Sequence, residues 1–203
     1  KGKNTGGMGA YSPSRLYNDE LEKKIIRKII QPTLNFLKKN NSKYIGFLYA
    51  GLMIKDNDPF LIEYNVRMGD PECQTILPLL DNDFLEIIDN CVRGKLDEID
   101  LKWKNEKSIC IVLTSMGYPD SYKKNILIEN LEKLKTNFNE YVFHAGTNLI
   151  NDKYYSDGGR VLNFVCLDKN LNNARQNCLK LIKKLNWENG YHRKDIGFKF
   201  IGN

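Results

Sequence analysis

Three polar side chains that could do chemistry alternate with apolar residues in the stretch Glu63 to Glu72, which reads EYNVRMGDPE. Successive side chains of a strand point to opposite faces, so Glu63, Asn65 and Arg67 would share one face at spacings of ~7 Å. A carboxylate and an amide oxygen suit a hard cation such as Mg2+, and a guanidinium suits a carboxylate or phosphate. The stretch therefore predicts either a metal and anion site or an ordinary solvent-exposed strand face.

The same stretch ends in Gly69, Asp70 and Pro71, which predict a tight turn into a helix that continues to Leu80. Gly69 permits an unusual backbone angle, Asp70 is a preferred helix cap and Pro71 fits the first helical position. Capping alone would explain Asp70. A polar strand that runs into a tight turn would also form the edge of a site.

A second candidate is the glycine-rich opening NTGGMGAYSP, which places Gly6, Gly7 and Gly9 within four positions. Such a backbone can approach an anion closely and direct several N–H groups towards it. The Gly-Lys-Ser/Thr ending of a P-loop is missing, as is the strand-GxGxxG-helix context of a dinucleotide fold. The opening is therefore interpreted as either a ligand loop or a flexible turn.

Hydrophobic periodicity indicates the elements that must position these residues. Apolar residues three or four apart predict a helix over Tyr17–Asn40, which Pro32 kinks or divides. The apolar runs Tyr44–Ile54 and Phe60–Met68 flank a turn-forming linker and predict an antiparallel hairpin. A further helix is predicted over Asp83–Arg93.

A polar tract at Lys95–Lys107 predicts a linker, so the chain is divided into domains 1–100 and 101–203. The second domain is predicted to contain strands at 108–115, 126–128, 141–145 and 160–166 and a helix over 171–185. The expected fold class is α+β, an antiparallel sheet with helices followed by a small α+β domain.

Composition narrows the class of protein. The formal charge of +6 would fit a nucleic acid or an anionic small substrate, but the Lys residues are scattered among acidic ones, so no nucleic-acid partner is expected. Five cysteines without a CxxC pair, and only two histidines, favour reduced thiols over a zinc site. No run approaches the ~18 apolar residues of a spanning helix, and no signal-peptide pattern opens the chain. We therefore expect a soluble, cytoplasmic protein without membrane contact.

Seven motifs occur together in the order KNTGGMGAYSP, GFLYAGLMI, IEYNVRMGDPECQTILPLL, GYP, VFHAGT, DGGRVL and YHRKDIG. They resemble the C-terminal half of the phosphoribosylamine-glycine ligase family, the glycinamide ribonucleotide synthetases of the ATP-grasp superfamily. The resemblance spans essentially the whole chain. It implies the C-terminal lobe of an ATP-grasp fold followed by the family's small C-terminal domain. The sequence lacks an initiator Met, so we expect a fragment that is inactive without the family's N-terminal domains.

The resemblance implies an ATP-dependent ligase of purine synthesis that forms glycinamide ribonucleotide from glycine and 5-phosphoribosylamine through glycyl phosphate. Glu63 and Asn65 match the family's ligand pair for Mg2+ or Mn2+. Arg67 and Asp70 are expected to act in catalysis and to contact substrate. The remaining expected substrate-binding residues are Asn4, Thr5, Gly6, Gly7, Met8, Gly9 and Arg160.

Other interpretations of the chain and of two of its residues stay open. The chain could belong to another ATP-grasp carboxylate-amine ligase, or it could be a non-catalytic interaction module. Arg160 could be a surface charge on a hairpin rather than an anion contact. His144 could be either a core histidine, which is the favoured interpretation, or a pocket residue.

Overall fold

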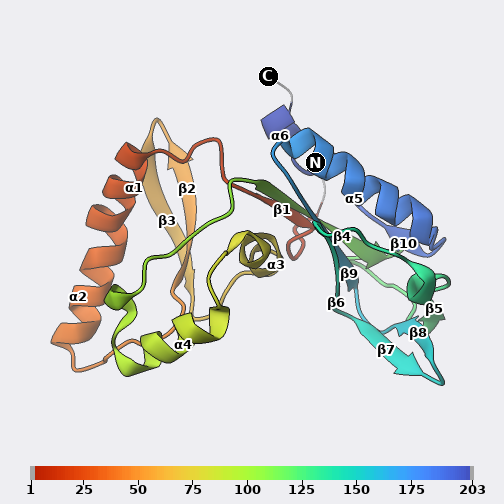
Figure 1. The fold of residues 1–203 in the computed structure, drawn as a ribbon, viewed down its shortest axis with the longest axis horizontal. Coiled ribbons are helices and arrows are strands. Elements are labelled where there is room, and N and C mark those ends of the chain that lie inside the picture. Colours follow the sequence, from red (N-terminus) through yellow and green to blue (C-terminus); the bar gives the residue numbers. More distant parts are fainter. Residues whose placement is uncertain (1–2, 202–203) are drawn as a thin grey trace. The chain divides into compact units, whose positions relative to one another are not determined.

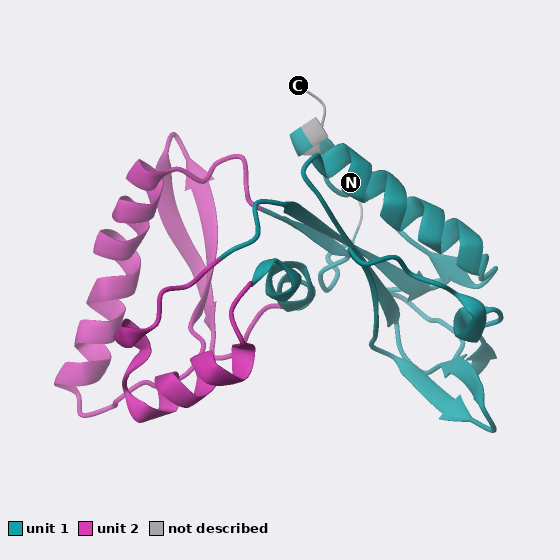
Figure 2. Ribbon diagram, in the orientation of Figure 1, with its two compact units in different colours: residues 1–12, 70–80, 103–203 teal, residues 13–69, 81–102 magenta. Residues whose placement is uncertain are grey.

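The computed structural model describes residues 3–201, which form two compact units (Figures 1 and 2). Unit 1 comprises residues 1–12, 70–80 and 103–203, and unit 2 comprises residues 13–69 and 81–102. The boundary predicted near residue 100 lies close to the seam at residues 102–103. Two earlier segments nevertheless belong to unit 1, so the compact units do not follow the linear division of the sequence.

The long helical segment of unit 2 consists of three parts: α1 (Asp19–Ile25), a π-helical stretch η1 (Ile26–Ile30) and α2 (Gln31–Lys39). Asn18 caps its start, because its side chain accepts a hydrogen bond from the backbone N–H of Leu21. The π-helical stretch lies directly before Pro32. Proline has no N–H to donate to the preceding turn, so the predicted interruption takes the form of a widened turn.

The predicted antiparallel hairpin is confirmed as β2 (Tyr49–Lys55) and β3 (Asp58–Asn65). Its two turn residues, Asp56 and Asn57, both have positive φ angles of 52° and 59°, as a two-residue hairpin turn requires. The pairing shifts between Gly51 and Leu52, which leaves one extra residue on β3. Both strands are shorter than predicted, since β2 begins at Tyr49 and β3 ends at Asn65.

The predicted helix over residues 83–93 is confirmed as α4 (Phe84–Arg93) in unit 2. The Asp83 carboxylate caps it by accepting from the N–H of Leu85, and Gly94 ends it with a φ of 72°. A short 3₁₀ turn, η3 (Leu96–Glu98), follows within the tract that was predicted to be a linker.

Unit 1 is built on an antiparallel sheet whose strand order is β1-β4-β9-β6, with β10 also paired to β4 (Figure 1). The bounds are β1 (Gly9–Ser12), β4 (Lys107–Ser115), β6 (Glu140–His144), β9 (Arg160–Asp168) and β10 (Gly190–Tyr191). A second antiparallel sheet has the order β5-β8-β7, with β5 (Ile126–Leu127), β7 (Thr147–Ile150) and β8 (Lys153–Ser156). Strands β1, β7, β8 and β10 were not predicted from the sequence.

The helices of unit 1 include α5 (Leu171–Leu185), whose bounds match the prediction. The others are α3 (Glu72–Ile76), the 3₁₀ turns η2 (Leu77–Leu79) and η4 (Leu131–Lys133), and α6 (Phe198–Ile201). Over residues 3–201, no helix has the length and apolar character needed to cross a lipid bilayer.

Strand β4 explains why the segment 70–80 belongs to unit 1. All of its residues after Lys107 are buried, because apolar side chains cover both faces of the strand. Ile109 and Ile111 pack in one hydrophobic cluster with residues of α5. Cys110 and Val112 point to the other face and pack in a cluster with Leu79 of η2. The α3–η2 segment therefore covers a sheet face that would otherwise be open to water.

Candidate functional site

The structure brings Glu63 and Asn65 together at the end of β3, in unit 2. The Asn65 Nδ2 group donates a hydrogen bond of 3.2 Å to Glu63 Oε1, so the two side chains lie on the same strand face, as predicted. Glu63 is exposed and Asn65 is half-buried. Gly51 is the cross-strand partner of Glu63, and a Cβ atom at Gly51 would lie 3.2 Å from Glu63 Cγ. The glycine thus leaves room for the glutamate side chain.

This pair has the donor set of a site for a hard divalent cation. A carboxylate oxygen and an amide oxygen are suitable ligands for Mg2+ or Mn2+, and a half-turn of the Asn65 amide presents Oδ1 in place of Nδ2. Within residues 3–201, His, Cys, Asp and Glu side chains form no group of three or more that could hold a metal. A cation held by these two side chains would complete its shell with water and phosphate oxygens.

Arg67 does not continue the row of Glu63 and Asn65, which corrects the predicted strand face. Strand β3 ends at Asn65, and the Arg67 Nη1 group donates 2.9 Å to the carbonyl oxygen of its neighbour Met68. On the opposite side, the apolar side chains of Ile62 and Val66 are 63% and 75% exposed, so they are not part of the core. The extra residue in β3 and the early strand end interrupt the regular alternation.

Unit 1 brings together four other predicted residues: Gly6, Gly7, Asp70 and Arg160. The Arg160 guanidinium donates 2.7 Å to Asp70 Oδ2 and 2.9 Å to the Asp70 carbonyl oxygen. It also donates 3.3 Å to the carbonyl oxygen of Gly7. Arg160 is only 26% exposed and joins the glycine-rich loop to the Asp70-Pro71 turn. The interpretation of Arg160 as an isolated surface charge is therefore wrong.

The predicted role of Asp70 as a helix cap is also wrong. The N-cap residue of α3 is Pro71, which follows a cis peptide bond, and no side chain caps this helix. The Asp70 carboxylate instead accepts from Arg160 and from Gln74 Nε2, at 3.0 Å for the latter. Asp70 therefore holds the loop and the turn in place, because its carboxylate is already bound to these two side chains.

The glycines of the loop allow close backbone packing. A Cβ atom at Gly7 would lie 2.4 Å from Pro71 Cδ and 2.8 Å from the Asp70 carbonyl oxygen. The N–H of Gly6 donates 3.0 Å to the Tyr118 hydroxyl. Thus the loop is fixed by its neighbours, which the flexible-turn interpretation does not explain.

A pocket of about 440 Å³ lies beside this loop, within unit 1, and its lining combines the predicted Thr5 and Met8 with residues that were not predicted from the sequence. Its lining residues are Lys3, Thr5, Met8, Tyr118, Pro119, Tyr191, Arg193, Lys194 and Asp195. Arg193 Nε donates 2.9 Å to Asp195 Oδ1, and this contact lowers the pKa of the Asp195 carboxyl. All of the lining residues belong to three of the sequence motifs, KNTGGMGAYSP, GYP and YHRKDIG, but the sequence did not show that folding brings these distant segments together.

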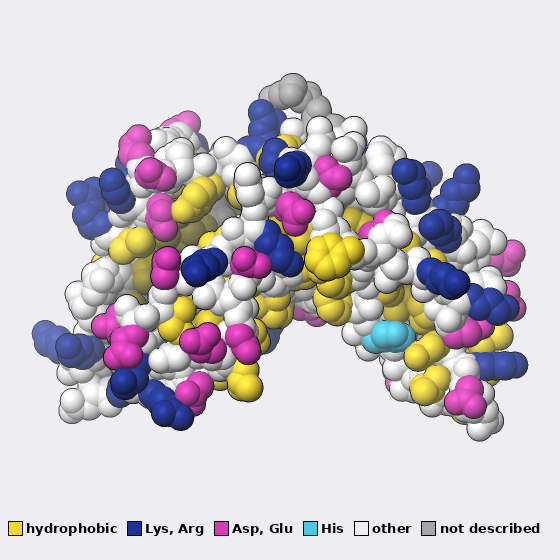
Figure 3. Space-filling model, in the orientation of Figure 1, with side chains coloured by type: hydrophobic (Ala, Val, Ile, Leu, Met, Phe, Trp, Pro, Cys, Tyr) yellow, Lys and Arg dark blue, Asp and Glu magenta, His cyan; other side chains and the backbone are white. Residues whose placement is uncertain are grey.

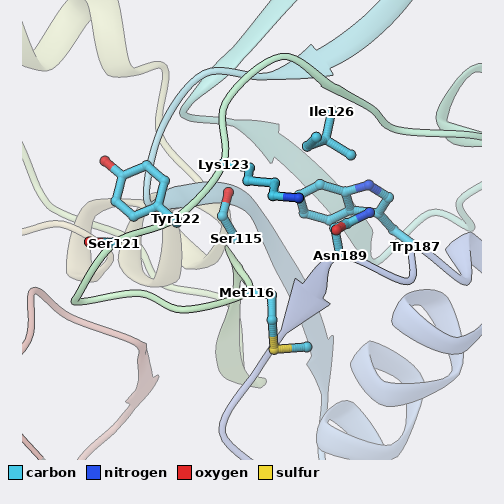
Figure 4. A pocket seen from close by; sticks show the side chains of 8 residues that line it. All are labelled: Ser115, Met116, Ser121, Tyr122, Lys123, Ile126, Trp187 and Asn189. Atoms are coloured by element: carbon cyan, nitrogen blue, oxygen red, sulfur yellow. The ribbon is translucent and has the colours of Figure 1, made fainter.

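A second pocket of unit 1, of about 420 Å³, contains none of the predicted site residues (Figure 4). It is lined by Ser115, Met116, Ser121, Tyr122, Lys123, Ile126, Trp187 and Asn189. The Trp187 Nε1 group donates 2.9 Å to the Leu127 carbonyl oxygen, so the indole is fixed in the pocket wall.

His144 lies at the exposed end of β6 rather than in the core, so the favoured core interpretation is wrong. Its Nδ1 atom is 2.8 Å from the Thr147 hydroxyl. On the face drawn in Figure 3, Lys and Arg side chains are interspersed with Asp and Glu, as the scattered sequence positions predicted.

The arrangement of sheets and helices matches the ATP-grasp class of proteins. Biotin carboxylase from Campylobacter jejuni superposes with a TM-score of 0.64 over 97% of this chain and 42% of that one. The two sequences are only 14% identical, so this likeness concerns the fold alone. An ATP-grasp domain is also the description of the family model that matches residues 1–73.

Within that class, the chain belongs to the phosphoribosylglycinamide synthetase family. Residues 1–73 match the model of its ATP-grasp (A) domain and residues 108–199 match that of its C domain. The crystal structure of phosphoribosylamine-glycine ligase from Thermotoga maritima superposes with a TM-score of 0.83 at 33% identity, over 97% of this chain and 48% of that one.

Curated relatives agree with this assignment. Phosphoribosylamine-glycine ligase from Fusobacterium nucleatum is 39% identical over 201 residues, which are 98% of this chain and 47% of the relative. The ligase from Caldanaerobacter subterraneus is 43% identical over 196 residues, 97% of this chain and 46% of the relative. The chain thus spans about half the length of the curated relatives it matches.

Proposed function

We propose that this chain forms part of a ligase that joins glycine to 5-phosphoribosylamine with ATP and yields glycinamide ribonucleotide, ADP and phosphate in purine synthesis. The observation that carries the proposal is the Glu63–Asn65 contact of 3.2 Å in a chain of this family. It supports a site for a divalent cation where the family places one. Family membership also favours this ligase over another ATP-grasp ligase or an interaction module.

The proposed reaction has two steps. The glycine carboxylate attacks the terminal phosphorus of ATP, which releases ADP and gives glycyl phosphate. The amine of phosphoribosylamine then attacks the acyl carbon, and phosphate leaves. A divalent cation, when bound, supplies positive charge to the transferring phosphoryl group. Neither step requires a protein nucleophile, so positioning and electrostatics would supply most of the rate enhancement.

The side chains of this chain would bind and orient the reactants. Glu63 and Asn65 would hold Mg2+ or Mn2+, and Arg67, beyond the end of β3, would bind an anionic group of a substrate. Asp70 would act through its ion pair with Arg160, which fixes the loop from Asn4 to Gly9 against the turn. The loop would then present its backbone to the substrate in one conformation.

We also propose that turnover requires the other half found in the relatives, with the 203-residue chain alone inactive. The lengths of the relatives support this, since each ligase described above is about twice as long as this chain. A cytoplasmic location is proposed from the cysteines, because among the described residues none of the five forms a disulfide.

The test is Glu63→Gln, with Glu86→Gln on α4 as a control of equal charge change in the same unit. In the full-length protein, Glu63→Gln should raise the Mg2+ concentration for half-maximal turnover by about tenfold or more, as loss of a metal contact typically does. In the 203-residue chain, Mn2+ should broaden the amide NMR signals around residues 63–65, and Glu63→Gln should remove this effect. An unchanged Mg2+ requirement in Glu63→Gln would refute the assignment.

A further inference from the structure

The 440 Å³ pocket of unit 1 is formed by three segments that are far apart in the sequence. They are the glycine-rich loop with Lys3 and Thr5, the turn at Tyr118, and the segment with Arg193 and Lys194. The volume lies within the ~300–1,000 Å³ that small-molecule sites usually have. All three segments belong to one compact unit, so the pocket is complete within it.

The lining of this pocket is rich in positive charge. Lys3, Arg193 and Lys194 face a single carboxylate, that of Asp195. Arg193 binds Asp195 through Nε and Nη2, while its Nη1 group makes no hydrogen bond to any residue that the structure describes. Within residues 3–201, Lys194 Nζ has no ion-pair partner. Lys3 pairs with Asp120 at 2.6 Å on the exposed side.

Neutral donors and a fixed backbone complete the site. Tyr118 accepts a hydrogen bond from the Gly6 N–H, which leaves its hydroxyl proton available for donation. Arg175 donates 2.9 Å to the Ile196 carbonyl oxygen and also binds the Lys194 carbonyl oxygen. The segment that carries the cations is therefore held by its backbone, and its charged heads need little reordering on binding.

Two cations of this region, Lys194 and Arg175, lie close enough to His192 to affect its pKa. Burial is the main cause that lowers the pKa of His192 below its usual value, and these two positive charges lower it further. An anion in the pocket would offset these charges.

We propose that this pocket binds the phosphomonoester of a sugar phosphate, namely the 5-phosphate of the phosphoribosyl substrate. Three cations and the hydroxyls of Thr5 and Tyr118 can all donate hydrogen bonds, which suits a dianionic group with three acceptor oxygens. The Asp195 carboxylate can accept from a ribose hydroxyl. The identity of the sugar rests on the proposed function, whereas binding of the phosphate rests on the lining alone.

The experiment uses the 203-residue chain and four probes: ribose 5-phosphate, ribose, inorganic phosphate and ADP. Titration calorimetry gives the affinity, and amide NMR shifts locate the bound probe. Ribose 5-phosphate should saturate with a Kd on the order of 1 mM and shift amides of the loop and of residues 191–195. Ribose should not bind, while inorganic phosphate and ADP should bind more weakly.

Lys194→Gln should weaken ribose 5-phosphate binding about tenfold or more, because a hydrogen bond to a charged group contributes about 1.5–3 kcal/mol. The control Lys183→Gln removes the same charge from the last turn of α5 and should leave the affinity unchanged. The proposal is overturned if these amides do not shift saturably by ~20 mM. Equal affinities of the two variants, or a preference for ADP, would also overturn it.

Full-length kinetics separate this proposal from the proposed function. Lys194→Gln should raise KM for phosphoribosylamine and leave KM for glycine and ATP unchanged. Ligase activity with an unchanged KM for phosphoribosylamine would reject the pocket and keep the function. The opposite outcome has two parts: the 203-residue chain binds ribose 5-phosphate, but the full-length protein does not join glycine to phosphoribosylamine. That outcome would reject the function and keep the pocket.

Discussion

The ion pair between Arg160 and Asp70 should be energetically coupled, and a double-mutant cycle can measure that coupling. Arg160→Met keeps the apolar stem of the side chain and removes all of its donors. Asp70→Asn keeps the shape of the acceptor and removes its charge. Both residues lie in unit 1, as do both tryptophans of the chain, Trp103 and Trp187, so intrinsic fluorescence reports the unfolding of this unit.

The magnitude follows from the contacts of Arg160 and their exposure. Arg160 donates to one carboxylate oxygen and two carbonyl oxygens, at 2.7, 2.9 and 3.3 Å. Each charge-assisted bond would contribute up to about 1.5–3 kcal/mol if fully buried. The side chains are 26% and 45% exposed, so solvent screening reduces these values. We expect Arg160→Met to lower the free energy of unfolding by about 2 kcal/mol, and Asp70→Asn by about 1 kcal/mol.

Urea unfolding of the wild-type chain, both single variants and the double variant gives the coupling energy, which should be about 1 kcal/mol. Lys124→Gln is the matched control, because its pair with Asp157 lies in the same unit at 3.2 Å and is 55% and 39% exposed. That control should change stability by less than about 0.5 kcal/mol. A coupling within about 0.3 kcal/mol of zero would show that Arg160 and Asp70 act independently, and would refute the reasoning.

Two further perturbations address the half-buried His192 and the glycine positions. The lowered pKa of His192 means that the unfolded chain binds more protons below pH ~6.5, so stability should fall as pH drops from there towards the folded-state pKa. His192→Gln should flatten this decline in urea unfolding at several pH values, whereas His144→Gln should keep it. Gly7→Ala should destabilise by about 1–3 kcal/mol, because its Cβ would meet Pro71 Cδ at 2.4 Å. Gly51→Ala in unit 2 should destabilise less, since its Cβ would come no closer than 3.2 Å, to Glu63 Cγ, and circular dichroism should follow it because that unit has no tryptophan.

Elements with a regular hydrophobic period could be predicted closely from the sequence. The α5 helix has its predicted bounds, and its buried face carries Leu171, Ala174, Cys178, Leu181 and Leu185. The continuous apolar run in β4 predicted a strand. The same run could have indicated burial on both faces, and hence the need for a covering segment such as α3–η2. That covering segment, around Leu79, comes from a distant part of the sequence, so linear division of the chain missed it.

Strand alternation predicted the shared face of Glu63 and Asn65, because residues two apart in a regular strand face the same side. The same rule failed at Ile62 and Arg67. At Ile62, an extra residue in β3 interrupts the alternation. Arg67 lies beyond the end of the strand. Periodicity therefore holds only as far as the pairing is regular, and nothing in the local sequence marks where that pairing stops.

Asp70 shows why tertiary contacts override a local signal. An Asp followed by Pro is favoured at the start of a helix, and isolated sequence reasoning therefore assigns the carboxylate to the helix. In the folded chain a guanidinium 90 positions away offers this carboxylate a charge-assisted bond of 2.7 Å. In that bond both partners are charged, whereas in a capping bond only the carboxylate would be, so the carboxylate binds Arg160 and α3 begins without a side-chain cap. The residue type was therefore sufficient to mark Asp70 as important, but only the distant partner determines what it does.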